Sequence, residues 1–158
     1  MKSSIKKGFS YGTTSGVITS LGLLVGLYST SNTVGVILAG LLTIAFADAF
    51  SDGLGIHVSE ESSGRLSHSE VWEATIATIA SKMALGLSFI IPILLLPLNI
   101  AVIIDFIWGF LALMFLSYVV AKQNKGKITS VLLEHTGLAV FVVLGSFLIG
   151  ELIKNFIK

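Results

Sequence analysis

The sequence predicts an all-α membrane protein: a single transmembrane domain over residues 1–158 that forms a bundle of five transmembrane helices. Hydrophobic residues make up 54% of the chain and charged residues only 12%. A water-soluble domain carries about twice that charged fraction, so the composition favours the lipid bilayer as the solvent. The apolar residues also fall into stretches of about 20 residues, the length that a helix needs to cross the hydrocarbon core.

Five apolar stretches are expected to span the membrane. Polar residues at 29–32 separate the first two stretches, and Pro97 and Asn99 favour a turn between the third and the fourth. A polar segment over 59–73 is expected to be the only substantial loop. The predicted spans cover residues 9–29, 33–56, 74–96, 99–121 and 128–153.

The placement of basic residues predicts the orientation of the bundle. If the spans alternate in direction, most lysines and the arginine lie on one side: Lys2, Lys6, Lys7, Arg65, Lys122, Lys125 and Lys127. Only Lys154 and Lys158 lie on the other side. The positive-inside rule then predicts a cytoplasmic N-terminus, a cytoplasmic 59–73 loop and an outside C-terminus. A prokaryotic plasma membrane is the expected location, and a net charge of +1 argues against a nucleic-acid partner.

Small and hydroxyl-bearing residues form one face of the first span. Their spacing of three and four residues places them on the same side of a helix: Gly12, Ser15, Gly16, Thr19, Gly22 and Gly26. Glycines at such spacing allow two helix backbones to approach closely. The pattern predicts helix packing, within the chain or in a homodimer through the Gly12/Gly16/Gly22/Gly26 face. A further interpretation makes the hydroxyl groups part of an ion path.

The second span carries two carboxylates, Asp48 and Asp52, which share a helix face with Ser51. At 1.5 Å per residue, Asp48 lies about 22 Å below the outer end of the span. A charge at that depth costs about 2.5–3.5 kcal/mol, which makes a functional site the default interpretation. Two carboxylates one turn apart repel each other, which favours proton exchange, and their oxygens suit hard or borderline divalent cations.

Lys82 provides an alternative explanation for Asp48. The third span runs opposite to the second, and counting residues from the outer turn places Lys82 at nearly the depth of Asp48. A buried Asp48–Lys82 pair would satisfy both charges without any transport. The two interpretations are compatible, because a lysine beside a carboxylate can act as a counter-ion that a cation displaces. Asp105, in the outer third of the fourth span, is expected to be interfacial, with an exit-side ligand as the alternative.

Imidazole and carboxylate groups follow the second span. His57, Glu60 and Glu61 are candidate ligands for Fe²⁺, Mn²⁺ or Zn²⁺ at the cytoplasmic mouth, although a solvated loop is the alternative. His68, Glu70, Glu73, Glu134 and His135 are weaker candidates of the same kind. The chain has no cysteine, no G-x-S-x-G elbow and no P-loop, so neither an enzyme nor a tightly bound cofactor is predicted.

Three stretches of the chain resemble the vacuolar iron transporter family. They are Thr14-Ser15-Gly16-Val17-Ile18-Thr19-Ser20, the run from Gly40 through Ala49-Phe50-Ser51-Asp52-Gly53-Leu54-Gly55, and the closing span from Gly137 through Gly150-Glu151-Leu152. The family's span-1 aspartate falls on Ser15 and its span-2 methionine on Asp52. The family's glutamate-rich cytoplasmic insertion is missing.

The resemblance implies a five-helix protomer with a cytoplasmic N-terminus, a homodimer with its ion path between the first spans, and export of Fe²⁺ or Mn²⁺ against inward protons. The predicted function is therefore divalent metal/proton exchange. In it, Asp48 and Asp52 bind metal and proton alternately, Ser15 and Ser51 contribute oxygens, and His57, Glu60 and Glu61 gather ions at the mouth. The alternative is a non-transporting membrane scaffold with a structural Asp48–Lys82 pair.

Overall fold

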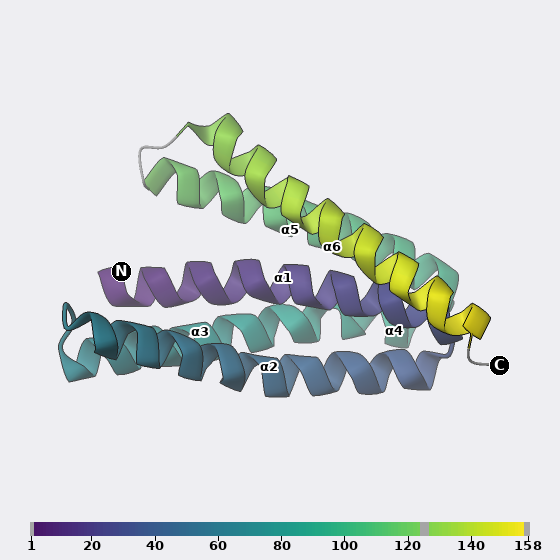
Figure 1. Ribbon diagram of the computed structural model, residues 1–158, viewed down its shortest axis with the longest axis horizontal. Helices are drawn as coiled ribbons and strands as arrows, with labels where there is room; N and C mark the ends of the chain where they lie inside the picture. The colour runs from purple at the N-terminus through teal and green to yellow at the C-terminus, as the bar shows by residue number, and fades with distance from the viewer. Residues whose placement is uncertain (1, 124–126, 157–158) are drawn as a thin grey trace.

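The computed structural model describes residues 2–123 and 127–156, and every regular element within them is a helix. Lys125 and Lys158, which contributed to the predicted orientation, lie outside the described residues. Figure 1 shows α1 in the middle of the bundle, with α2 and α3 on one side and α5 and α6 on the other. The helices are α1 (Ser3–Ser31), α2 (Val34–Ser63), α3 (His68–Ser88), α4 (Ile90–Leu95), α5 (Leu98–Gln123) and α6 (Ile128–Phe156).

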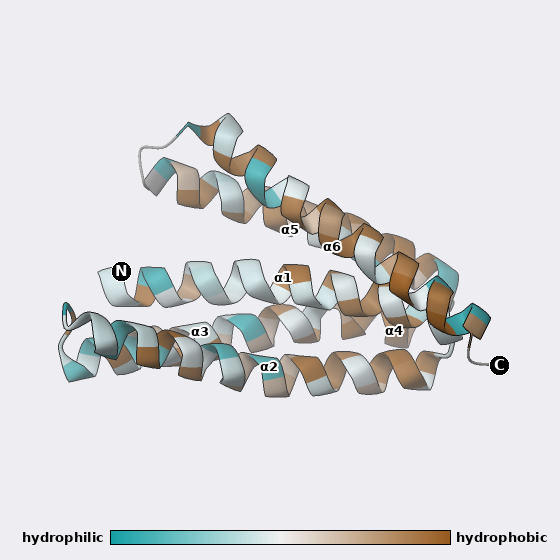
Figure 2. Ribbon diagram, in the orientation of Figure 1, coloured by the Kyte–Doolittle hydropathy of each residue, from teal (hydrophilic) through white to brown (hydrophobic). Residues whose placement is uncertain are grey.

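Within the described residues, four helical segments are long and apolar enough to cross a membrane: Val34–Ser63, His68–Leu95, Leu98–Lys122 and Ile128–Phe156. Their outward faces carry large apolar side chains, among them Phe46 at 59% and Phe141 at 75% exposure. Figure 2 shows these hydrophobic residues along most of α5 and α6 and along the part of α2 nearest its beginning. Such surface is stable in lipid and not in water, so the chain is a multi-pass membrane protein.

The helix α1 is not among these four segments, because its many glycine and hydroxyl-bearing residues lower its hydropathy. Ser4, Thr13 and Ser20 are buried. At its start, Lys2 and Ser4 bind the two carboxylate oxygens of Glu73, at 2.5 and 2.7 Å. The hydrogen bond to Glu73 raises the pKa of Lys2 above its ordinary value. Hydrogen bonding to the beginning of α3 therefore fixes the beginning of α1.

The glycine face of α1 packs within the chain. A Cβ atom at Gly12 would overlap the Thr78 carbonyl oxygen of α3, and one at Gly22 would overlap Val142 of α6. Gly16 contacts α3 and Gly26 contacts α6 in the same way, with slightly more room. The glycine face of α1 therefore packs against other helices of the same chain, which was one of its two predicted roles. A homodimer stays a prediction, but Gly12 and Gly16 are already covered by α3.

The prediction of a loop over 59–73 is wrong. The helix α2 continues to Ser63 and ends at Gly64, whose φ of 62° lies in the left-handed region that glycine adopts without strain. The helix α3 begins at His68, after a capping box in which the Ser67 backbone N–H donates to Glu70 Oε2 at 2.9 Å. A helix that has left the hydrocarbon core needs no apolar side chains, so hydropathy does not detect its continuation.

The third predicted span is interrupted at Phe89, between α3 and α4. Pro92 has no backbone N–H and its ring crowds the carbonyl of Ser88, so the regular hydrogen-bond ladder cannot continue through this point. The Phe89 N–H instead donates to the Gly86 carbonyl at 3.3 Å, as in a tighter turn. The predicted turn at Pro97 is confirmed, because α5 begins at the following residue.

Candidate functional site: a buried lysine between two aspartates

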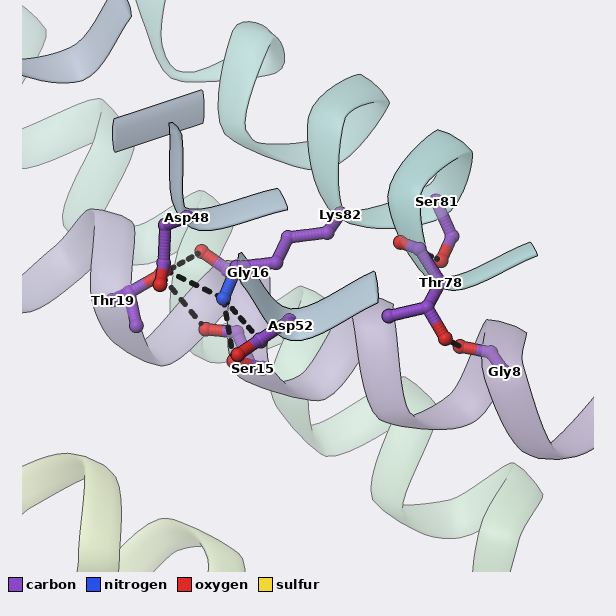
Figure 3. Close-up of polar contacts among 9 residues, drawn as sticks. All are labelled: Gly8, Ser15, Gly16, Thr19, Asp48, Asp52, Thr78, Ser81 and Lys82. Carbon is purple, nitrogen blue, oxygen red and sulfur yellow. Dashed lines mark hydrogen bonds and ion pairs between the residues drawn. The ribbon is translucent and has the colours of Figure 1, made fainter. Parts of the chain in front are cut away.

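The side chain of Lys82 is buried inside the bundle, with 2% of its surface exposed, and contacts three polar groups. Its ammonium nitrogen lies 2.5 Å from Asp48 Oδ2 and also forms an ion pair with Asp52 Oδ2. It donates a hydrogen bond to Ser15 Oγ at 2.8 Å. Figure 3 shows the three oxygen-bearing side chains converging on the end of Lys82. We call Ser15, Asp48, Asp52 and Lys82 the lysine cluster.

Three helices build the lysine cluster. Asp48 and Asp52 are one turn apart on α2, so they project from the same face toward α3. Ser15 comes from α1 and donates a hydrogen bond to Asp52 Oδ2 at 2.7 Å. The stem of Lys82 crosses α1 at Gly16, where an added Cβ would lie 3.3 Å from Lys82 Cγ. The absence of a side chain at Gly16 thus leaves room for the lysine to reach both carboxylates.

The charges of the cluster do not cancel when both aspartates are ionised. Two carboxylates face one ammonium group, which leaves one negative charge in excess. Asp48 Oδ2 makes the ionic contact with Lys82 but has no hydrogen-bond partner. A buried ion pair is stable only when its geometry and its remaining hydrogen bonds compensate for the lost hydration. One carboxylate would suffice to neutralise Lys82, so the second carboxylate exceeds what a structural pair needs.

The cluster is open on its Asp48 side. Asp48 has 28% of its side-chain surface exposed, and it lines a groove of about 700 Å³ between α1 and α2, together with Thr19 and Ser51. Thr19 itself donates to the Ser15 carbonyl at 3.0 Å and does not bind either aspartate. The side chain of Asp48 therefore reaches the outside of the cluster in this groove, whose other lining residues are mostly apolar.

The predicted proximity of Asp48 and Lys82 is confirmed, and the structure also brings Asp52 and Ser15 to the same ammonium group. Ser51 was predicted to contribute an oxygen alongside them. It lies on the wall of the groove beside Asp48 and is not one of the groups that contact Lys82. Counting residues by depth identified the first pair, but it gave no information on the reach of the lysine side chain.

The three residues predicted to gather metal at the mouth do not form one site. His57 Nδ1 lies 3.0 Å from Thr75 Oγ1, and its Nε2 is 4.0 Å from Glu61 Oε2. Glu60 is buried and forms an ion pair with Lys7 of α1. Over residues 2–123 and 127–156, no three His, Asp or Glu side chains lie together in a way that could hold a metal ion.

Asp105 on α5 is completely buried, and neither of its carboxyl oxygens has a hydrogen-bond partner. The side chain of Asp105 is therefore not solvated as an exposed interfacial carboxylate would be, and its depth in the membrane stays a prediction. The adjacent turn of α5 packs tightly on α1, where an added Cβ at Gly109 would overlap Leu21. This close approach encloses Asp105 in the core.

In comparisons with protein-family models, with curated proteins and with solved structures, no match to this chain was found.

Proposed function

We propose that the protein transports a divalent metal cation across the membrane in exchange for protons, with the lysine cluster as its binding site. The observation that supports this proposal is the convergence of Asp48 and Asp52 on the single buried ammonium group of Lys82. An ionisable residue inside a membrane bundle marks an ion or proton pathway by default. Here the carboxylates outnumber the cation that neutralises them, which leaves an excess negative charge for a transported ion.

In the proposed exchange, the metal ion takes the place that the ammonium group of Lys82 occupies. Asp48, Asp52 and Ser15 then supply oxygen ligands, which suit hard or borderline cations such as Mn²⁺ and Fe²⁺. The metal ion displaces the ammonium group from the two carboxylates. Asp48 and Asp52 bind the metal and the proton alternately, because both need the same carboxylate oxygens, so the proton and the metal exclude each other from the same site.

In this proposal α1 also crosses the membrane, which gives five spans together with the four segments described above. The 29 residues of α1 rise about 43 Å, which exceeds the thickness of the hydrocarbon core. Several of its polar residues, among them Thr13 and Ser20, are buried against other helices, so these residues do not oppose a membrane-spanning position. An odd number of passes places the N-terminus and the basic residues Arg65 and Lys122 on the cytoplasmic side and the end of α6 outside. Metal then leaves the cytoplasm as protons enter.

Flux of Mn²⁺ or Fe²⁺ into proteoliposomes with an imposed proton gradient tests the function. We expect metal flux that follows the gradient and is lost in Asp48→Asn, which removes one carboxylate charge from the cluster. Glu151→Gln is the matched control, because Glu151 pairs with Lys154 at the end of α6, far from the cluster. Unimpaired flux in Asp48→Asn would rule out the assignment of the site.

A non-transporting scaffold is the second candidate, and the near-complete burial of Lys82 favours it. A permanent structural ion pair has this property. The scaffold predicts no flux of any cation through the folded wild-type protein. It also predicts that Asp48→Asn combined with Lys82→Met folds as well as wild type, whereas the transporter loses flux in this double variant.

A further inference from the structure

A second cavity lies on the opposite side of Ser15 from the groove at Asp48. It is an open cavity with a volume of about 350 Å³ between α1, α5 and α6. Five of its seven lining residues carry a hydroxyl or imidazole group: Ser10, Tyr11, Thr14, Ser15 and His135. A cavity of this size far exceeds the roughly 15 Å³ that a water molecule needs, and polar lining groups are what retain water in a protein interior.

The inner end of this cavity is part of the lysine cluster. Ser15 lines the cavity, and its hydroxyl both accepts from Lys82 at 2.8 Å and donates to Asp52 at 2.7 Å. A water molecule that contacts Ser15 from the cavity is therefore one hydrogen bond away from Asp52. The cavity provides a polar route to the cluster that does not pass through the Asp48 groove.

His135 is the one titratable imidazole on the described wall of this cavity. Its Nδ1 lies 2.8 Å from the hydroxyl oxygen of Ser117, which is buried in α5. The only hydroxyl proton of Ser117 is donated to the Leu113 carbonyl at 2.7 Å. Nδ1 of His135 must then donate to Ser117, which leaves Nε2 as the basic nitrogen of the neutral ring.

The cavity lies toward the end of the bundle at which α1 begins. Ser10 and Tyr11 belong to the first third of α1, and Val120 is in the last turn of α5. Figure 1 shows α5 and α6 diverging from α1 toward this same end. An opening here faces the side of the membrane that holds the N-terminus.

We infer that this cavity is a water-filled vestibule, through which hydrated cations and protons reach the lysine cluster from the side of the N-terminus. His135 Nε2 is its ion-accepting group, and Ser15 is the contact through which Asp52 meets the vestibule. The role of the vestibule in supplying transported ions rests on the proposed function. Its hydration and its sidedness do not, because they follow from the lining residues and their positions.

The absence of cysteine from the chain allows a direct accessibility test. Thr14→Cys and Ser10→Cys place a thiol on the vestibule wall, and Val17→Cys is the matched control on α1 because Val17 is completely buried. A charged, membrane-impermeant thiol reagent is applied separately to each side of oriented vesicles. Thr33→Cys, which is exposed at the opposite end of α1, reports the other side.

We expect the reagent to modify Thr14→Cys and Ser10→Cys from the side of the N-terminus only, and to leave Val17→Cys unmodified. If both vestibule thiols react only with an uncharged, membrane-permeant reagent, a lipid chain fills the cavity and the inference is overturned. Modification from the side of Thr33 would overturn it as well. Labelling without any metal flux would support the vestibule and reject the proposed function. Metal flux without labelling would support the proposed function and reject the vestibule.

The role of His135 is tested separately, by metal flux. His135→Ala should raise the Mn²⁺ concentration at half-maximal flux several-fold while leaving the maximal flux within about twofold, because the mouth concentrates ions but the cluster carries them. His135→Gln, which keeps a hydrogen-bonding side chain toward Ser117, separates ion capture from packing. If both variants match wild type at low Mn²⁺, His135 is not the ion-accepting group.

Discussion

Replacing Lys82 by methionine isolates the electrostatic role of the cluster. Methionine keeps most of the length and apolar volume of the lysine stem, which packs on α1 at Gly16. The substitution removes the one positive charge that contacts Asp48 and Asp52. The two carboxylates then face each other one turn apart, with 28% of the Asp48 side chain and 18% of the Asp52 side chain exposed.

The expected loss of stability follows from burial. Removing one partner of a buried ion pair leaves an uncompensated charge and costs about 3–5 kcal/mol. The carboxylates that remain are partly exposed, at 28% for Asp48 and 18% for Asp52, so Lys82→Met should reach the lower part of this range. The triple variant Lys82→Met, Asp48→Asn, Asp52→Asn carries no charge in the cluster, and it should recover most of the lost free energy of unfolding.

The assay is equilibrium unfolding of the reconstituted protein, followed by the fluorescence of its two tryptophans. Lys82→Met and the triple variant are compared with wild type in the same lipid. A Lys82→Met variant as stable as wild type would refute the reasoning, since the carboxylates would then not depend on the ammonium group. Equal instability of the triple variant would instead attribute the loss to packing.

Three further substitutions test separate contacts by the same unfolding assay. Asp105→Leu should stabilise the protein by about 1–3 kcal/mol, because both buried carboxyl oxygens lack partners; destabilisation would show that they have one. Gly8→Ala should lower the free energy of unfolding by about 1–3 kcal/mol, since its Cβ would overlap the backbone of α3. Gly137→Ala meets open space and should be neutral or stabilising. Similar stability changes in the two variants would contradict the packing of α1. Ser15→Ala should cost about 1 kcal/mol and Ser51→Ala nothing measurable, and the reverse order would contradict the geometry of the cluster.

Hydropathy was sufficient to predict the helical membrane bundle, because spans of about 20 apolar residues depend on bilayer thickness alone. Hydropathy failed to predict the helix ends that lie outside the apolar stretches. Glu60 and Glu61 belong to α2, although their polarity suggested a loop, because the helix continues beyond the apolar region. The interruption at Phe89 follows from Pro92, which the sequence contains, but hydropathy averages over a single proline.

The candidate site was predictable in part. Asp48 and Lys82 could be paired by their depth in the membrane, because residues at equal depth on neighbouring antiparallel helices lie side by side. The second contact, with Asp52, depends on the length of the lysine side chain and on the space at Gly16, neither of which depth expresses. His135 and Ser15 meet one cavity from helices far apart in the sequence, so only the fold identifies the vestibule.

The central claim is that a metal ion and the ammonium group of Lys82 compete for the same two carboxylates. Mn²⁺ binding to the purified protein, measured by the loss of the electron paramagnetic resonance signal of free Mn²⁺, tests it most directly. We expect saturable binding to wild type, tighter binding to Lys82→Met because the competing cation is gone, and no binding to Asp48→Asn combined with Asp52→Asn. Equal affinity in all three proteins, or weaker binding to Lys82→Met than to wild type, would contradict it.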